Sequence, residues 1–278
     1  MFKDSIIDSL NYINSLIIGV GQDSSLASTL VGFNAILYGF CNAIMTVMKP
    51  VGYSILGLFL MLELSKISIK MEASGGGSTA SMKMVFGILI KATLCKLAVD
   101  NTSVIMNTIF NMSLHMTQQV SGILSGGAAA GGLNIALLST VVNNMGMGDQ
   151  IGAVIQIFII KILINGVIAL VNVIVIGRFV EIYLYIAVSP IPVATIPGEE
   201  LSSIAKNFFK SFAAVCIQGT LIYIVLGFFP SLMSAAILGS MGGTDINTAL
   251  FAVMAYCILL ALAVFSCGKL AKSICNAM

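Results

Sequence analysis

Long apolar runs with almost no charge dominate this chain and limit the folds that it can form. One run, Ile151–Ile176, reads IGAVIQIFIIKILINGVIALVNVIVI and contains a single charged residue. Of the 278 residues 58% are hydrophobic and 9% are charged, whereas a soluble domain carries about 25% charged residues. A soluble fold of this size could not bury so much apolar surface. We therefore expect lipid to be its main solvent, which removes most enzyme classes from consideration.

The continuity of the runs predicts helices rather than a transmembrane barrel. In hydrocarbon only helices and closed barrels satisfy their backbone groups, and barrel strands alternate apolar and polar residues. A spanning helix needs about 20 apolar residues. The sequence therefore predicts an all-α, polytopic membrane helical bundle of about six to eight membrane-embedded helices, plus an N-terminal amphipathic helix.

The predicted amphipathic helix occupies residues 1–25. Its apolar residues recur every three or four positions, which places them on one face: Phe2, Ile6, Leu10, Ile13 and Ile17. Asp4, Asp8, Asn11 and Asn14 fall on the other face. This helix can lie in the membrane interface or pack against the protein's own bundle, and the sequence favours neither.

The next region, residues 26–70, is predicted to be a membrane hairpin. Its limbs are Leu30–Val47 and Val51–Leu64, separated by Lys49-Pro50. Proline interrupts backbone hydrogen bonding, and a lysine prefers the membrane interface. A single long, kinked helix is the alternative.

Residues 71–150 are predicted to combine a Gly/Ser linker at 71–82, helices that are amphipathic or membrane-associated, and a Gly-rich central loop at 119–150. Within this region, residues 83–118 form either two crossings or two interfacial helices. Residues 151–278 are predicted to form a four-helix membrane region with these spans: Ile151–Ile176, Phe179–Ile196, Phe208–Phe229 and Leu250–Ser266.

The distribution of cations predicts the orientation, because cytoplasmic loops are rich in Lys and Arg. With both termini in the cytoplasm, only Lys49 and Arg178 of the counted cations lie outside. The cations inside are then Lys3, Lys66, Lys70, Lys83, Lys206, Lys210, Lys269 and Lys272.

No residue pattern indicates catalysis. His115 is the single histidine, and none of the six cysteines forms a CxxC pair. A triad or a histidine-based metal site would therefore lack its usual groups. We expect no catalytic residue, no cofactor and no metal.

Charges within the apolar runs are the candidate functional residues, since each is costly in lipid unless it is paired, hydrated or near an interface. Glu63 and Lys66 are three residues apart and can pair on one helix face, and Arg178 and Glu181 share that spacing. Unpaired charges lie at Lys91, Lys96 and Lys161. These seven residues either line a polar lumen or gate, or fix helix packing.

Small residues are predicted to mediate close contacts between helices. Glycines at positions 52, 57, 219 and 227 fall within apolar segments. In lipid, small side chains let helix backbones approach closely, which favours a packed or oligomeric bundle.

The most individual stretch is Gly177–Gly198, GRFVEIYLYIAVSPIPVATIPG, in which an arginine opens an apolar span that closes on Ser-Pro and further prolines. The chain also has a hydrophobic N-terminal hairpin, a Gly-rich middle and a Lys-tailed final helix. Together these features resemble the TrbL/VirB6-like polytopic membrane subunits of conjugative type IV secretion systems, in the form found in Gram-positive bacteria. The resemblance covers residues 25–270 in architecture and 150–230 in residue pattern.

The resemblance implies a non-enzymatic subunit of the cytoplasmic membrane that crosses it several times. Such a subunit oligomerises and helps to form the translocation path for DNA and relaxase. The implied partners are membrane lipid, further copies, VirB8-like, VirB3-like and VirB4-like ATPase subunits, and transiently a single-stranded DNA–relaxase substrate. Gram-negative members are usually described with an external N-terminus, so both orientations stay open.

A secondary transporter or channel for a small solute or ion is the alternative function. Transporters often have broken helices at corresponding positions of two halves. The Lys49-Pro50 and Ser189-Pro190 sites match that description, although no repeat of residue pattern accompanies them. A third possibility is a scaffold that anchors an ATPase through Pro197–Lys210.

Overall fold

The computed structural model is predominantly helical in the residues that it describes. These are 2–21, 24–73, 78–124, 135, 139–140, 142, 146–198, 201–240 and 246–277. They contain no strand, which confirms the all-α prediction. The chain divides into two compact units. The first unit comprises Met1–Ser28, Ser113–Arg178 and Ile217–Ala271, and the second comprises Thr29–Met112, Phe179–Cys216 and Lys272–Met278.

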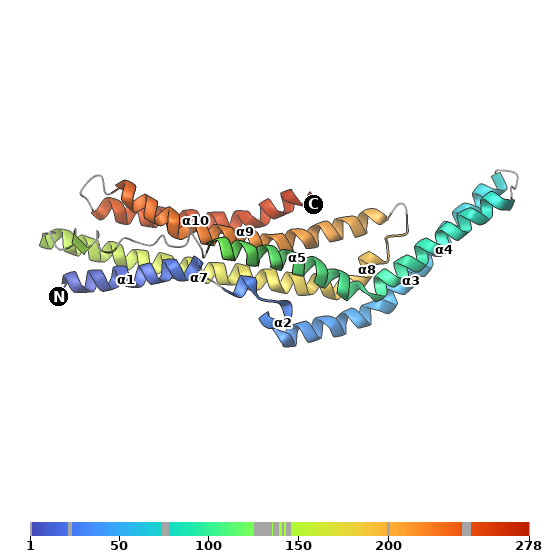
Figure 1. Ribbon diagram of the computed structural model, residues 1–278, viewed down its shortest axis with the longest axis horizontal. Coiled ribbons are helices and arrows are strands. Elements are labelled where there is room, and N and C mark those ends of the chain that lie inside the picture. Colours follow the sequence, from blue (N-terminus) through green and yellow to red (C-terminus); the bar gives the residue numbers. More distant parts are fainter. Residues whose placement is uncertain are drawn as a thin grey trace. The chain divides into compact units, whose positions relative to one another are not determined.

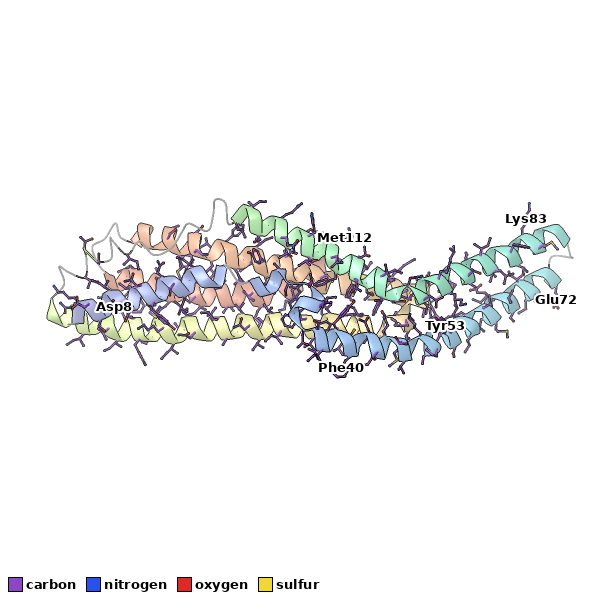
Figure 2. All side chains as sticks on the ribbon, turned by 60° about the horizontal axis from the view of Figure 1, so that its bottom comes forward. Asp8, Phe40, Tyr53, Glu72, Lys83 and Met112 are labelled. Atoms are coloured by element: carbon purple, nitrogen blue, oxygen red, sulfur yellow. The ribbon has the colours of Figure 1, made fainter. Side chains whose placement is uncertain are left out.

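Helix α1 (Phe2–Gly21) packs within the first unit. Its predicted apolar face is buried, with Ile6, Leu10, Ile13 and Ile17 at most 1% exposed. Asp8 lies on the exposed face (Figure 2). Of the two placements that the sequence left open, the structure shows packing against the protein itself.

Helices α7 (Met147–Val188) and α10 (Ile246–Ile274) bury narrow seams, and α7 up to Arg178 and α10 up to Ala271 belong to the first unit. The seam residues recur alternately every three and four positions, as in a coiled coil. In α10 they are Leu250, Val253, Cys257, Leu260, Val264, Cys267 and Ala271. Large apolar side chains cover the other faces, among them Phe158 of α7 and Phe265 of α10, which are 64% and 58% exposed. Such faces suit contact with lipid.

The predicted helix end at Gly177-Arg178 is wrong, because α7 continues through it to Val188. A glycine inside a helix costs only about 1 kcal/mol, and Arg178 is buried rather than placed at an interface. The helix ends before Pro190, where the short helix α8 (Pro190–Val193) begins. The described part of residues 151–278 thus contains three long helices rather than the predicted four spans: α7, α9 (Ser202–Ser240) and α10.

In the second unit, α3 (Ala35–Ala73) and α4 (Ser78–Asp100) lie side by side as an antiparallel pair (Figure 1). Glu72 and Lys83 lie near the same end of this pair (Figure 2). At the other end, Tyr53 of α3 donates a hydrogen bond to the Asp100 carboxylate of α4. Helix α3 begins after Asn34, whose side-chain oxygen accepts from the Leu37 N–H at 3.0 Å.

The predicted hairpin at Lys49-Pro50 is also wrong, and the alternative of one long helix is correct. Pro50 lies inside α3, where it removes the single hydrogen bond to the Thr46 carbonyl. Contacts with α4 compensate, since Lys49 Nζ donates to the Asp100 carbonyl oxygen at 2.9 Å. The hairpin instead pairs α3 with α4. The predicted linker at 71–82 is helical at 71–73 and 78–82, and its residues 74–77 lie outside the described residues.

Helix α8 packs closely against α3 and α4. A Cβ at Gly52 of α3 would lie 2.9 Å from the Pro190 carbonyl oxygen, so only glycine permits this approach. Beside it is a small core formed by Leu56, Cys95, Val99, Val193 and Ala194. The prediction that Gly52 mediates close helix contact is confirmed.

Four helical segments in the described residues are long and apolar enough to cross a membrane. They are Ala35–Ile69, Gln150–Val188, Ser202–Ala235 and Asn247–Ile274. The predicted limbs Leu30–Val47 and Val51–Leu64 lie largely in the single helix α3, and most of the predicted spans Ile151–Ile176 and Phe179–Ile196 lies in α7. Residues 83–118 belong to α4 and to α5 (Thr102–Ile123), which are not among the four. The predicted Gly-rich loop at 119–150 falls mostly outside the described residues.

We predict that Gly52→Ala destabilises the second unit by about 1–3 kcal/mol, because the new methyl group would overlap the backbone of Pro190. Thermal unfolding in a mild detergent measures the effect. Gly57→Ala is the matched control on the same helix, because no heavy atom lies within 4 Å of its Cβ position. Equal melting temperatures for the two variants would contradict the close contact.

Candidate functional site

Three of the predicted charged residues meet in one cavity of the second unit, between α3 and α4. The cavity has a volume of about 280 Å³ and contains Glu63, Lys66 and Lys91 in its lining. Lys66 Nζ lies 4.0 Å from Glu63 Oε1, so the predicted pair on one helix face is present. The rest of the lining is apolar or small: Leu56, Phe59, Leu60, Ile67, Met84, Gly87, Ile88, Ala92 and Pro197.

A larger cavity, of about 640 Å³, adjoins the first. Lys91 and Pro197 line both cavities, and Lys206 of α9 adds a further cation to the larger one. The other lining residues are Leu94, Cys95, Ala98, Ile196, Gly198, Ser202, Ala205 and Phe209. Lys206 was not among the predicted site residues. In the sequence it lies in the polar segment Pro197–Lys210, which separates two apolar spans and therefore indicates a boundary rather than a site. Lys96 is exposed on α4 and lines neither cavity.

Lys161 lies on α7 in the first unit and contacts α1. Its Nζ donates to Ser9 Oγ at 2.8 Å and lies 5.5 Å from the centre of the Tyr12 ring. Both contacts link α7 to α1. Spacing along the chain could not reveal them, since Ser9 is 152 residues away.

Arg178 is 4% exposed and lies against α9 in the first unit. A Cβ at Gly219 would overlap its guanidinium group, so the glycine provides the space that the group occupies. Glu181, the predicted partner of Arg178, is half-buried on the next turn of α7 and is assigned to the second unit.

A polar seam joins α5 to α9 in the first unit. Thr117 Oγ1 and Thr220 Oγ1 lie 2.9 Å apart, and Tyr223 donates to Ser121 Oγ at 2.8 Å. A Cβ at Gly227 would overlap Leu124, which extends the close contact by another turn. From one contact to the next, the residue numbers rise in both segments, so the two segments run parallel. The sequence signal was the spacing of four residues between Ser113, Thr117 and Ser121.

The described residues contain no group of three His, Cys, Asp or Glu side chains that could hold a metal ion. The predicted site residues are lysines, one arginine and two glutamates, which can pair with opposite charges or bind anions. The arrangement can therefore position helices or hold an anionic group.

Apolar spans, narrow buried seams and glycine contacts together define the chain as a helical membrane protein. A family model described as TrbL/VirB6 plasmid conjugal transfer-like protein matches residues 20–190. The match covers more than half of the chain, which belongs to the TrbL/VirB6 plasmid conjugal transfer-like family. No curated protein and no solved structure matches the chain.

We predict that Gly219→Ala displaces the Arg178 guanidinium and lowers the free energy of unfolding by about 1–3 kcal/mol. Adding Arg178→Ala removes the overlap, so the double variant should lose less than the sum of the two single losses. Thermal or denaturant unfolding in detergent measures the coupling. Gly177→Ala is the control, because its Cβ position is open. Strict additivity would contradict the contact.

Proposed function

We propose that the protein is a non-enzymatic channel or scaffold subunit of a conjugative type IV secretion machine. It oligomerises in the cytoplasmic membrane and helps to form the path for the DNA–relaxase substrate. The observation that supports this most strongly is the family match over residues 20–190 in a chain with four apolar helices of spanning length.

The exposed surfaces of the long helices support assembly with other membrane helices. Gly57 of α3 and Gly166 of α7 are both exposed, and no heavy atom lies within 4 Å of the position that a Cβ would take at either glycine. In lipid, small residues permit close helix contacts, so such positions suit a neighbouring subunit. Further copies of this chain and VirB3-like or VirB8-like subunits are the proposed neighbours.

The proposed topology is multi-pass with both termini in the cytoplasm, as the distribution of lysines favours. A VirB4-like ATPase then supplies the energy from the cytoplasmic side, and this chain supplies no chemistry of its own. A Gram-positive host accords with the use of lysine rather than arginine for nearly all of the cations.

The charged residues take two roles in this proposal. Lys161 and Arg178 fix helix packing through Ser9 and Gly219, respectively. Glu63, Lys66, Lys91, Lys96 and Glu181 are available to line a polar path or to contact partners.

We predict that deleting the gene from the conjugative element that carries it abolishes transfer and leaves growth unchanged. Mating frequency measures the first effect and growth curves the second. Complementation by Gly177→Ala should restore transfer, whereas Gly219→Leu should restore less, because leucine enlarges the overlap with Arg178. Normal transfer by the deletion strain would contradict the proposal.

We also predict that the protein purified in a mild detergent forms particles of several 29.1 kDa copies. Mass photometry with negative-stain imaging measures their mass and shape. Gly166→Leu should shift the mass downward if this open glycine faces another copy, and Ile162→Leu, one turn away on α7, serves as control. A monomer in every detergent tested would contradict self-assembly.

The alternative, a small-solute or ion transporter, predicts an uptake defect with normal transfer. Its sequence support was a pair of corresponding helix breaks, but α3 is continuous through Pro50 while α7 ends before Pro190. Solute uptake by the deletion strain, measured beside mating frequency, separates the two functions.

A further inference from the structure

The two adjoining cavities of the second unit combine apolar walls with clustered lysines. We propose that they bind an anionic phospholipid, whose phosphate is held by Lys91 and Lys206 and whose acyl chain lies along the apolar lining. The proposal goes beyond a role in conjugation and requires only that the protein lies in a membrane.

The charges of the lining complement an anion. Lys66, Lys91 and Lys206 line the cavities, and Glu63 is the one carboxylate among the lining residues. Because Glu63 lies 4.0 Å from Lys66, Lys91 and Lys206 are the cations best placed for a ligand. The whole second unit has nine lysines and six carboxylates, so its general field is also positive.

The remaining walls suit an acyl chain. Phe59, Ile67 and Ile88 line the smaller cavity. Leu94, Ile196 and Phe209 line the larger one, whose volume of about 640 Å³ lies in the range of ordinary small-molecule sites, about 300–1,000 Å³. A free inorganic anion would gain nothing from these apolar walls, whereas a lipid chain would remain in contact with apolar groups throughout.

The position along α3 favours a lipid headgroup over a soluble anion. Glu63 and Lys66 lie in the last two turns of the spanning segment Ala35–Ile69, where charged side chains reach toward the membrane interface. Phospholipid phosphates lie at that level. Leu94 of the lining and the nearby Leu62 are 61% and 49% exposed, so the cavities open beside apolar surface that suits contact with lipid.

The test uses the full-length protein in a mild detergent, with native mass spectrometry to count bound lipids. Phosphatidylglycerol is the anionic probe, and phosphatidylcholine with the same chains is the zwitterionic control. We expect preferential binding of phosphatidylglycerol and a loss of affinity of about fivefold for each lysine removed in Lys91→Gln and Lys206→Gln.

Matched controls lie on the same helices. Lys96→Gln on α4 and Lys210→Gln on α9 remove exposed lysines that line neither cavity, and both should bind like the wild type. Ala92→Phe fills the smaller cavity without changing charge and should also weaken binding. Melting temperatures identify any variant that fails to fold.

Three results would overturn the proposal. The first is equal binding of the two lipids by the wild type. The second is an equal loss in the cavity and control variants, which would indicate only a general attraction to positive charge. The third is displacement of phosphatidylglycerol by excess inorganic phosphate, which would indicate a site for free phosphate. None of these results depends on whether the protein supports DNA transfer.

Discussion

Helices surrounded by lipid gain little from hiding apolar side chains against each other, so their packing depends on close fit and on polar contacts. This chain meets the requirement with glycines at specific contacts. Gly52 admits the backbone of Pro190, Gly219 admits the Arg178 side chain, and Gly227 admits Leu124. The long helices can therefore bury narrow seams and leave the rest of their apolar surface to lipid or to other subunits.

Polar contacts between helices also contribute to the packing, at buried and half-buried positions. Lys49 donates to the carbonyl oxygen of Asp100, where α4 ends, and Thr117 contacts Thr220 between α5 and α9. Lys161 binds Ser9 of α1. The last two contacts join helices that are distant in sequence, and all three help to fix which helices are neighbours, a choice that uniformly apolar surfaces cannot make.

The sequence predicted the helical membrane fold, the apolar face of α1 and the Glu63–Lys66 pair, because each depends on composition or on spacing within one helix. It failed at Pro50 and at Gly177-Arg178, where local signals for a helix end were overruled by contacts with residues far along the chain. The sequence also could not predict that Lys91 and Lys206 line the same cavity, since 115 positions of the chain separate them. Hydropathy also could not reveal the buried seam of α10, because all faces of that helix are apolar.

The contact between Arg178 and Gly219 has a consequence for how such sequences can diverge. A larger residue at position 219 is destabilising while an arginine occupies position 178, and the arginine needs the glycine to remain buried. Neither position can change first without cost. Among relatives the two should therefore vary as a linked pair, and a chain that has lost the arginine is released from the requirement for glycine.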